Sequence, residues 1–232
     1  MSVSIEHQAD LGILTLDRPR RAHAYDAAML ETLEGGLDAL LDDPQIRVIV
    51  VESTGEGAFC GGADLEALKA STPMDALDLR SQRVFDKLAR APKISIAAIQ
   101  GAAVAGGFEL ALACDIRVVG PKASFSLPET GLGLIPSAGG TTRLTRLLGP
   151  ARAKMVILGG REIDAETALT WGLVERVTDR PREDARHLAA RVARRNPLAQ
   201  RLAKAIIDLD DPSASLQAER LAEAVLYAQR AR

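Results

Sequence analysis

The sequence is poor in cysteine, histidine and aromatic residues, and each scarcity excludes a class of protein. Its 232 residues include 2 cysteines, too few for a disulfide framework. The 3 histidines lie far apart and no CxxC pair occurs, so we expect no metal site. Aromatic residues make up 3% of the chain, which argues against a surface that stacks nucleic-acid bases.

The sequence also has no large excess of positive or negative charge. Lys and Arg number 29 against 31 Asp and Glu, a net charge of −2, so a nucleic-acid partner is not expected. The longest uncharged stretch, residues 94–108, is too short to cross a bilayer. The first residues lack the basic and apolar regions of a signal peptide. We therefore expect a cytoplasmic protein with no membrane partner.

Strand and helix signals alternate along the first half of the chain, and helical signals dominate after residue 141. Apolar patterns predict strands at residues 3–8, 12–17, 46–52, 94–100, 116–119 and 124–127, and a short one within 173–177. Helices are predicted at residues 27–41, capped by Asp26, in a region that reaches residue 90, and at residues 106–114. This order indicates an α/β fold, with a length that suits one domain or one domain with an appended helical piece.

Two glycine-rich loops, around residues 60–64 and 105–109, each follow a predicted strand and lead into a helix. The second begins like a P-loop, but Gly107 and Phe108 stand where that motif needs Lys and Ser or Thr. Helix N-termini present free N–H groups, and two of them facing one point would bind a carbonyl oxygen as it gains negative charge. The alternative is that the glycines only permit tight turns, and spacing alone leaves both interpretations open.

Two glutamates stand in apolar surroundings. Glu109 is the only charge in the predicted helix 106–114, and Glu129 directly follows a predicted strand. A buried carboxyl group shifts toward its neutral form, and two in one dry pocket can divide the roles of acid and base. The alternative is structural: an ion pair with Arg117 or Arg143, or a loop cap in the case of Glu129.

Three separated segments resemble the signatures of the enoyl-CoA hydratase/isomerase (crotonase) family, in the family's order. They are AFCGGADL at 58–65, IQGAAVAGGFELALACD at 99–115, and the segment 125–144 that contains SLPE and LGLIPSAGGTTRL. Together with DRP at 17–19 and GLV at 172–174, the similarity covers most of the chain.

This resemblance implies a crotonase-like spiral of ββα units in the α/β class. Residues 1–178 would form the core that carries the acyl-CoA site, and residues 179–232 a helical C-terminal trimerisation region. That region is shorter than in longer family members, which continue with a further helix. A homotrimer or a dimer of trimers is expected.

The resemblance also implies the site residues. Glu109 would help to activate water and Glu129 would deliver the α-proton, while the N–H groups of Ala63 and Gly106 hold the thioester oxygen. The positions that match the coenzyme A contacts of the family are Arg20, Arg21, Ala22, Gly61, Asp64 and Leu65. His23 stands where the family often has Asn, and Glu66 where some hydratases carry Lys.

The implied activity is a lyase of fatty acid metabolism that adds water reversibly across the 2,3-double bond of an enoyl-CoA. No cofactor is expected, since coenzyme A is part of the substrate. One alternative is a Δ3–Δ2 enoyl-CoA isomerase or a dehydratase of a modified acyl-CoA. Another is a non-catalytic member that only binds acyl-CoA.

Overall fold

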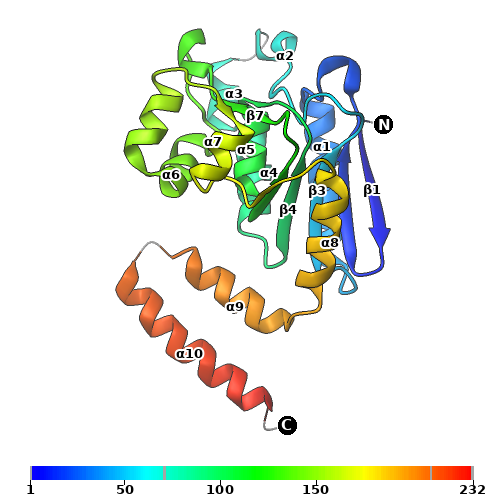
Figure 1. Ribbon diagram of the computed structural model, residues 1–232, viewed down its shortest axis with the longest axis vertical. Coiled ribbons are helices and arrows are strands. Elements are labelled where there is room, and N and C mark those ends of the chain that lie inside the picture. The colour runs from blue at the N-terminus through cyan, green and yellow to red at the C-terminus, as the bar shows by residue number, and fades with distance from the viewer. Residues whose placement is uncertain (1, 70–71, 210, 231–232) are drawn as a thin grey trace.

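The computed structural model describes residues 2–69, 72–209 and 211–230, arranged around a six-stranded sheet (Figure 1). The strands, in spatial order, are β1 Val3–Gln8, β2 Leu11–Leu16, β3 Val48–Ser53, β4 Ile94–Ile99, β6 Ile116–Val119 and β9 Arg176–Val177. The first pair is antiparallel and all other neighbours are parallel. All these strands lie within a few residues of their predicted positions.

A second, three-stranded sheet consists of β5 Ala103–Val104, β7 Ser124–Ser126 and β8 Ile163–Asp164. The sequence predicted only β7, since strands of two residues are too short to show a periodic pattern. Ala103 of β5 pairs with Phe125 of β7 in parallel. This pairing sets the chain that continues into Gly106 beside the chain that continues into Glu129.

The helices are α1 Ala27–Asp42, α2 Leu65–Lys69, α3 Pro73–Leu77, α4 Arg80–Ala89, α5 Gly106–Ala113, α6 Gly140–Ile157, α7 Ala165–Thr170, α8 Pro181–Ala193, α9 Pro197–Ile207 and α10 Pro212–Arg230. Two short 3-10 helices are η1 Pro19–Arg21 and η2 Glu129–Leu132. The predicted cap of α1 is confirmed, because the Asp26 carboxylate accepts a hydrogen bond of 2.9 Å from the Met29 N–H. Helix α6 is interrupted at Gly149, whose φ of 76° is not helical.

Both faces of the central strands β3 and β4 are buried, which explains their continuous apolar runs, whereas the edge strand β1 is mostly exposed. Val51 and Ile99 face the cluster formed with α1, α4 and α5, while Val50 and Ala98 face α8. Ala189 of α8 is fully buried against that second face. The sheet and α5 thereby form a rigid platform for the loops at the strand ends.

Helices α9 and α10 lie away from the sheet, and α10 packs against α9 (Figure 1). Lys204 of α9 anchors this pair by an ion pair of 2.8 Å with Asp115. Several large apolar side chains of the pair are exposed, namely Ile207, Leu216, Leu221, Val225 and Tyr227. The predicted division of the chain near residue 178 stays a prediction. No helix in the described residues is long and apolar enough to cross a membrane.

Candidate active site

The N–H groups of Ala63 and Gly106 lie on two loops that touch. A methyl group built on Gly62, directly before Ala63, would come within 3.0 Å of the Gly106 nitrogen. Within the described residues neither N–H donates a hydrogen bond, although the next N–H, that of Asp64, donates to the Tyr25 carbonyl at 2.8 Å. Two unused N–H groups on adjoining loops can bind one carbonyl oxygen.

A strained residue sets the start of α5. Ala105 has φ 51° and ψ −126°, a conformation that costs a non-glycine residue about 1–3 kcal/mol. Its N–H donates to the Ser126 carbonyl at 2.9 Å, and its own carbonyl accepts from the N–H of Glu109 at 3.0 Å. The small sheet and α5 therefore fix this turn, and with it the Gly106 N–H.

Tyr25 contacts both loops and was not singled out from the sequence. Its backbone N–H donates to the Gly62 carbonyl at 2.8 Å, and a methyl group on Gly106 would lie 1.9 Å from its hydroxyl oxygen. The side chain is 8% exposed and packs edge-on against Phe85, with ring centroids 5.8 Å apart. Burial raises the pKa of this hydroxyl, which keeps it neutral. In the sequence, the only sign of this role is that Tyr25 is an aromatic residue directly before the cap of α1.

Glu109 is held by a loop before α6. The side chain is 4% exposed, as its apolar helix predicted. Its Oε1 atom accepts hydrogen bonds from the N–H groups of Ala138 at 2.7 Å and Gly140 at 2.8 Å. Burial raises the pKa of Glu109, while the two N–H groups and the positive charge of Arg143 oppose that rise. The bonds favour the carboxylate form and fix the orientation of the side chain.

Arg117 is not the partner of Glu109. Its guanidinium donates to the backbone carbonyls of Leu173 at 2.7 Å and Cys114 at 2.6 Å. This residue therefore fastens α5 to the chain before β9. Arg143, the other alternative partner, lowers the pKa of Glu109 but binds other groups directly.

Glu129 lies at the start of η2, on the chain that leaves β7. It is 8% exposed, and its buried Oε2 atom has no hydrogen-bond partner within the described residues. Burial, with a further contribution from the negative charge of Glu109, raises the pKa of Glu129 to about 7. A carboxyl group with that pKa can give or take a proton at neutral pH.

The two carboxyl groups therefore differ in their surroundings, and the negative charge of Glu109 acts on Glu129. Glu109 accepts hydrogen bonds that favour its carboxylate form. The Oε2 atom of Glu129 has no donor within the described residues that would stabilise a carboxylate there. A pair of carboxyl groups in such different surroundings can hold one proton between them. Next to a bound carbonyl group, this arrangement suits the transfer of protons at the neighbouring carbon atoms.

The residues predicted to contact coenzyme A gather on two adjoining segments. Arg20 and Arg21 are exposed on η1, and the Ala22 carbonyl accepts a hydrogen bond of 2.9 Å from the Gly61 N–H. Leu65 is exposed at the start of α2. These positions form one exposed edge beside the Ala63 loop.

Asp64 differs from the other predicted contacts because its carboxylate is buried. It pairs with Arg18 at 3.1 Å, and Arg18 also pairs with Asp26 at 3.1 Å. The Arg18 N–H donates to Nδ1 of His23 at 3.0 Å, and the burial of this histidine lowers its pKa. Arg18 thus ties the loop after Ala63 to the start of α1, and the buried His23 accepts a hydrogen bond from the backbone beside it.

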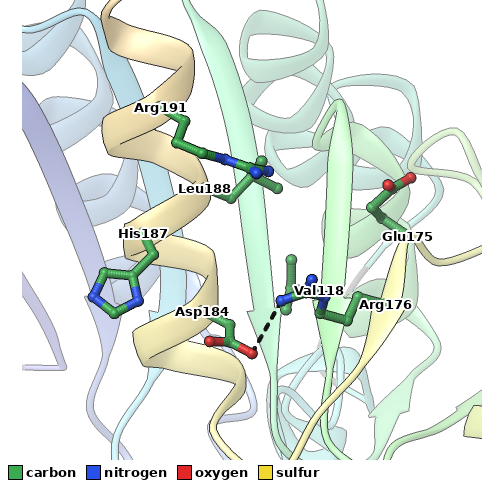
Figure 2. A pocket seen from close by; sticks show the side chains of 7 residues that line it. All are labelled: Val118, Glu175, Arg176, Asp184, His187, Leu188 and Arg191. Carbon is green, nitrogen blue, oxygen red and sulfur yellow. Dashed lines mark hydrogen bonds and ion pairs between the residues drawn. The ribbon is translucent and has the colours of Figure 1, made fainter.

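A shallow cavity of about 200 Å³ lies elsewhere, between α8 and β6–β9 (Figure 2). It is lined by Val118, Glu175, Arg176, Asp184, His187, Leu188 and Arg191. Its charged groups partly pair with each other, since Arg176 lies 3.5 Å from Asp184. None of the predicted site residues lines this cavity.

The comparisons with known proteins agree with the fold and with the family resemblance. The sequence profile named "Enoyl-CoA hydratase/isomerase" matches residues 6–231. The chain belongs to the enoyl-CoA hydratase/isomerase family, which confirms the resemblance and the prediction of an enzyme of this family.

The chain covers about four-fifths or more of the relatives and structures described next. YngF of Bacillus subtilis is 42% identical over 214 residues, which cover 89% of this chain and 80% of that protein. The crotonyl-CoA hydratase of Syntrophomonas wolfei is 34% identical over 209 residues, 88% of this chain and 80% of that protein. The crystal structure of an enoyl-CoA hydratase from Bacillus anthracis superposes with a TM-score of 0.92 at 36% identity, covering 97% of this chain and 90% of that chain. The predicted crotonase-like fold is therefore confirmed.

Proposed function

We propose that this protein is an enoyl-CoA hydratase, which adds water reversibly across the 2,3-double bond of an acyl-CoA thioester. The observation that carries the proposal is the pair of carboxyl groups, Glu109 and Glu129, beside two N–H groups that have no partner within the described residues. The name of the Syntrophomonas wolfei relative, a crotonyl-CoA hydratase, supports a short unsaturated acyl group.

In the forward direction, the Glu109 carboxylate takes a proton from a water molecule as the water oxygen bonds to C3. The electron pair of the double bond moves toward the thioester, giving an enolate whose oxygen is held by the N–H groups of Ala63 and Gly106. The Glu129 carboxylic acid then delivers its proton to C2. The proton gained by Glu109 returns to Glu129 through solvent, so the enzyme is regenerated and the net reaction is the addition of one water.

This assignment of roles follows from the surroundings of each carboxyl group. Glu109 accepts two backbone hydrogen bonds that favour its ionised form, which a base needs. Glu129 has a pKa of about 7 because of its burial, which suits an acid at neutral pH. Hydration leaves the oxidation level unchanged, so the reaction needs no redox cofactor.

Coenzyme A would lie along the exposed edge formed by Arg20, Arg21, Ala22, Gly61 and Leu65. The two arginines supply positive charge for its phosphates. Asp64 would shape this edge from behind, because its carboxylate is bound to Arg18 and its N–H donates to the Tyr25 carbonyl. We also propose a cytoplasmic homotrimer or dimer of trimers, which would cover the exposed apolar residues of α9 and α10.

A second candidate is the Δ3–Δ2 isomerase reaction. It is favoured by the unpartnered Oε2 atom of Glu129, since one carboxyl group can move a proton between the α- and γ-carbons. Isomerisation would then persist in a Glu109→Gln variant while hydration is lost.

The test is a panel of short, medium and long 2-enoyl-CoA and 3-enoyl-CoA thioesters, followed by the absorbance of the conjugated enoyl group. A hydratase removes this absorbance from the 2-enoyl substrates, whereas an isomerase creates it from the 3-enoyl substrates. Tight binding of coenzyme A thioesters without any turnover would contradict both activities and indicate a binding protein.

A further inference from the structure

Arg143 of α6 lies behind the loop that binds Glu109. Its Nη1 atom donates to the Ala138 carbonyl at 2.8 Å, and its Nη2 atom donates to the Asp86 carboxylate of α4 at 3.3 Å. The side chain is largely buried, with 18% of its surface exposed. Arg143 therefore links α4, α6 and the loop across the back of the site.

Ala138 of this loop forms hydrogen bonds with both Glu109 and Arg143. Ala138 donates its N–H to Glu109 at 2.7 Å and accepts from Arg143 through its carbonyl. The next residue, Gly139, has φ 108°, and a Cβ atom there would lie 1.9 Å from the Arg143 Nη1 atom. The loop thus wraps closely around the guanidinium, so the place of the Glu109 donors depends on where Arg143 lies.

We propose that Arg143 is a positioning residue for the reaction: it holds the loop whose N–H groups bind Glu109, and its positive charge favours the carboxylate form of that side chain. The proposal rests on the proposed function in that Glu109 is taken as the base. The guanidinium contacts a carbonyl and Asp86 directly, so its charge acts on Glu109 from across the loop.

The charge balance around Glu109 supports this role. The groups with an electrostatic influence on Glu109, or influenced by it, are Arg143 from α6, Glu129 from η2 and Tyr25 before α1. Tyr25 is kept neutral by its burial, and Glu129 is negative when ionised. Among these three groups, Arg143 alone stabilises the Glu109 carboxylate by opposite charge.

The experiment compares Arg143→Gln with the matched control Arg90→Gln. Arg90 binds the other oxygen of the same Asp86 carboxylate at 2.7 Å, but its side chain is 80% exposed, and within the described residues no hydrogen bond joins it to the loop. The carboxyl pKa of Glu109 is measured by ¹³C NMR in the free protein, with the resonance assigned through Glu109→Gln. The pH dependence of kcat/KM is measured on the same variants.

We expect Arg143→Gln to raise the Glu109 pKa by roughly half a unit or more, because a stabilising positive charge is lost. The acidic limb of kcat/KM moves to higher pH by the same amount, and kcat falls more than KM changes. Arg90→Gln changes none of these quantities. A Glu109 titration in folded Arg143→Gln that matches the wild type would overturn the proposal.

Arg143→Lys serves if the glutamine variant does not fold. Lysine keeps the charge but lacks the forked donors, so Glu109 keeps its pKa while kcat falls. A wild-type kcat in this variant would contradict the positioning role. If the wild-type protein hydrates no enoyl-CoA, the proposed function fails, yet the NMR titration still tests the link between Arg143 and Glu109.

Discussion

The hydroxyl group of Tyr25 lies against the α-carbon of Gly106, where a methyl group would come within 1.9 Å of the hydroxyl oxygen. Gly106→Ala must therefore displace the tyrosine or shift the Gly106 N–H. Removing one donor of this kind lowers kcat by a factor on the order of 10²–10³. Steady-state kinetics with a short 2-enoyl-CoA measure the effect, and thermal unfolding shows whether the fold is kept.

Gly35→Ala is the matched control for that substitution. Gly35 lies on α1, where a Cβ atom would meet nothing within 4 Å, so activity is expected to be unchanged. Stability should rise by about 0.5–1 kcal/mol because alanine favours the helix. Equal activity of the two alanine variants would contradict the role of the Gly106 N–H.

The pH dependence of stability reports the burial of Glu129. Its pKa rises from 4.5 to about 7 on folding, so the folded state favours the protonated form. The stability that this group contributes is fully present below pH 4.5 and is lost as the pH rises through about 7. Glu129→Gln should remove this loss. Denaturant unfolding at several pH values between these limits checks it, and parallel curves for both proteins would contradict the burial.

The pH profile of catalysis is expected to be bell-shaped, because the active pair holds one proton. Above a pH of about 7, Glu129 loses that proton and kcat/KM falls. Hydration and dehydration are expected to show the same fall above this pH, since both need the carboxyl pair to hold one proton. Initial rates in the two directions measure it, and a flat profile through neutral pH would exclude Glu129 as the acid.

The exposed face of α10 is expected to be an interface between subunits. Leu221 of α10 is 65% exposed. Within the described residues, the one element against which α10 packs extensively is α9. Leu221→Asp should reduce the assembly, because a charge cannot be buried there without a partner. Light scattering after size exclusion measures the mass. Glu31→Gln, which changes an exposed charge on α1, is the control and should leave the assembly intact.

Much of the fold could be predicted because its long elements follow clear periodic patterns. The apolar runs of β3 and β4 and the apolar face of α1 can be read from residues close together in sequence. The cap at Asp26 depends only on the next three residues. Strands β5 and β8 were missed because each has only two residues and no apolar run marks it, unlike β9, which follows Leu173 and Val174. The break of α6 at Gly149 was not predicted, although the pair Gly149-Pro150 is typical of turns.

In the candidate site, too, local sequence predicts the burial of a side chain but not its partners on other elements. The burial of Glu109 followed from its apolar helix, but the donors at Ala138 and Gly140 lie on another element. Tyr25 contacts Gly62 and Gly106, and Arg143 contacts Asp86, which are all distant in sequence. No local pattern marks such contacts. The sequence could thus indicate two carboxyl groups as candidates, while the structure shows how their surroundings differ.

The most direct test of the account is the turnover of a short 2-enoyl-CoA by Glu109→Gln and Glu129→Gln, each checked for its fold by thermal unfolding. Each substitution keeps the shape of the side chain and removes its ability to exchange a proton. The account predicts that each lowers the hydration kcat by a factor on the order of 10²–10⁴. Turnover close to that of the wild type in either folded variant would contradict the two-carboxylate mechanism.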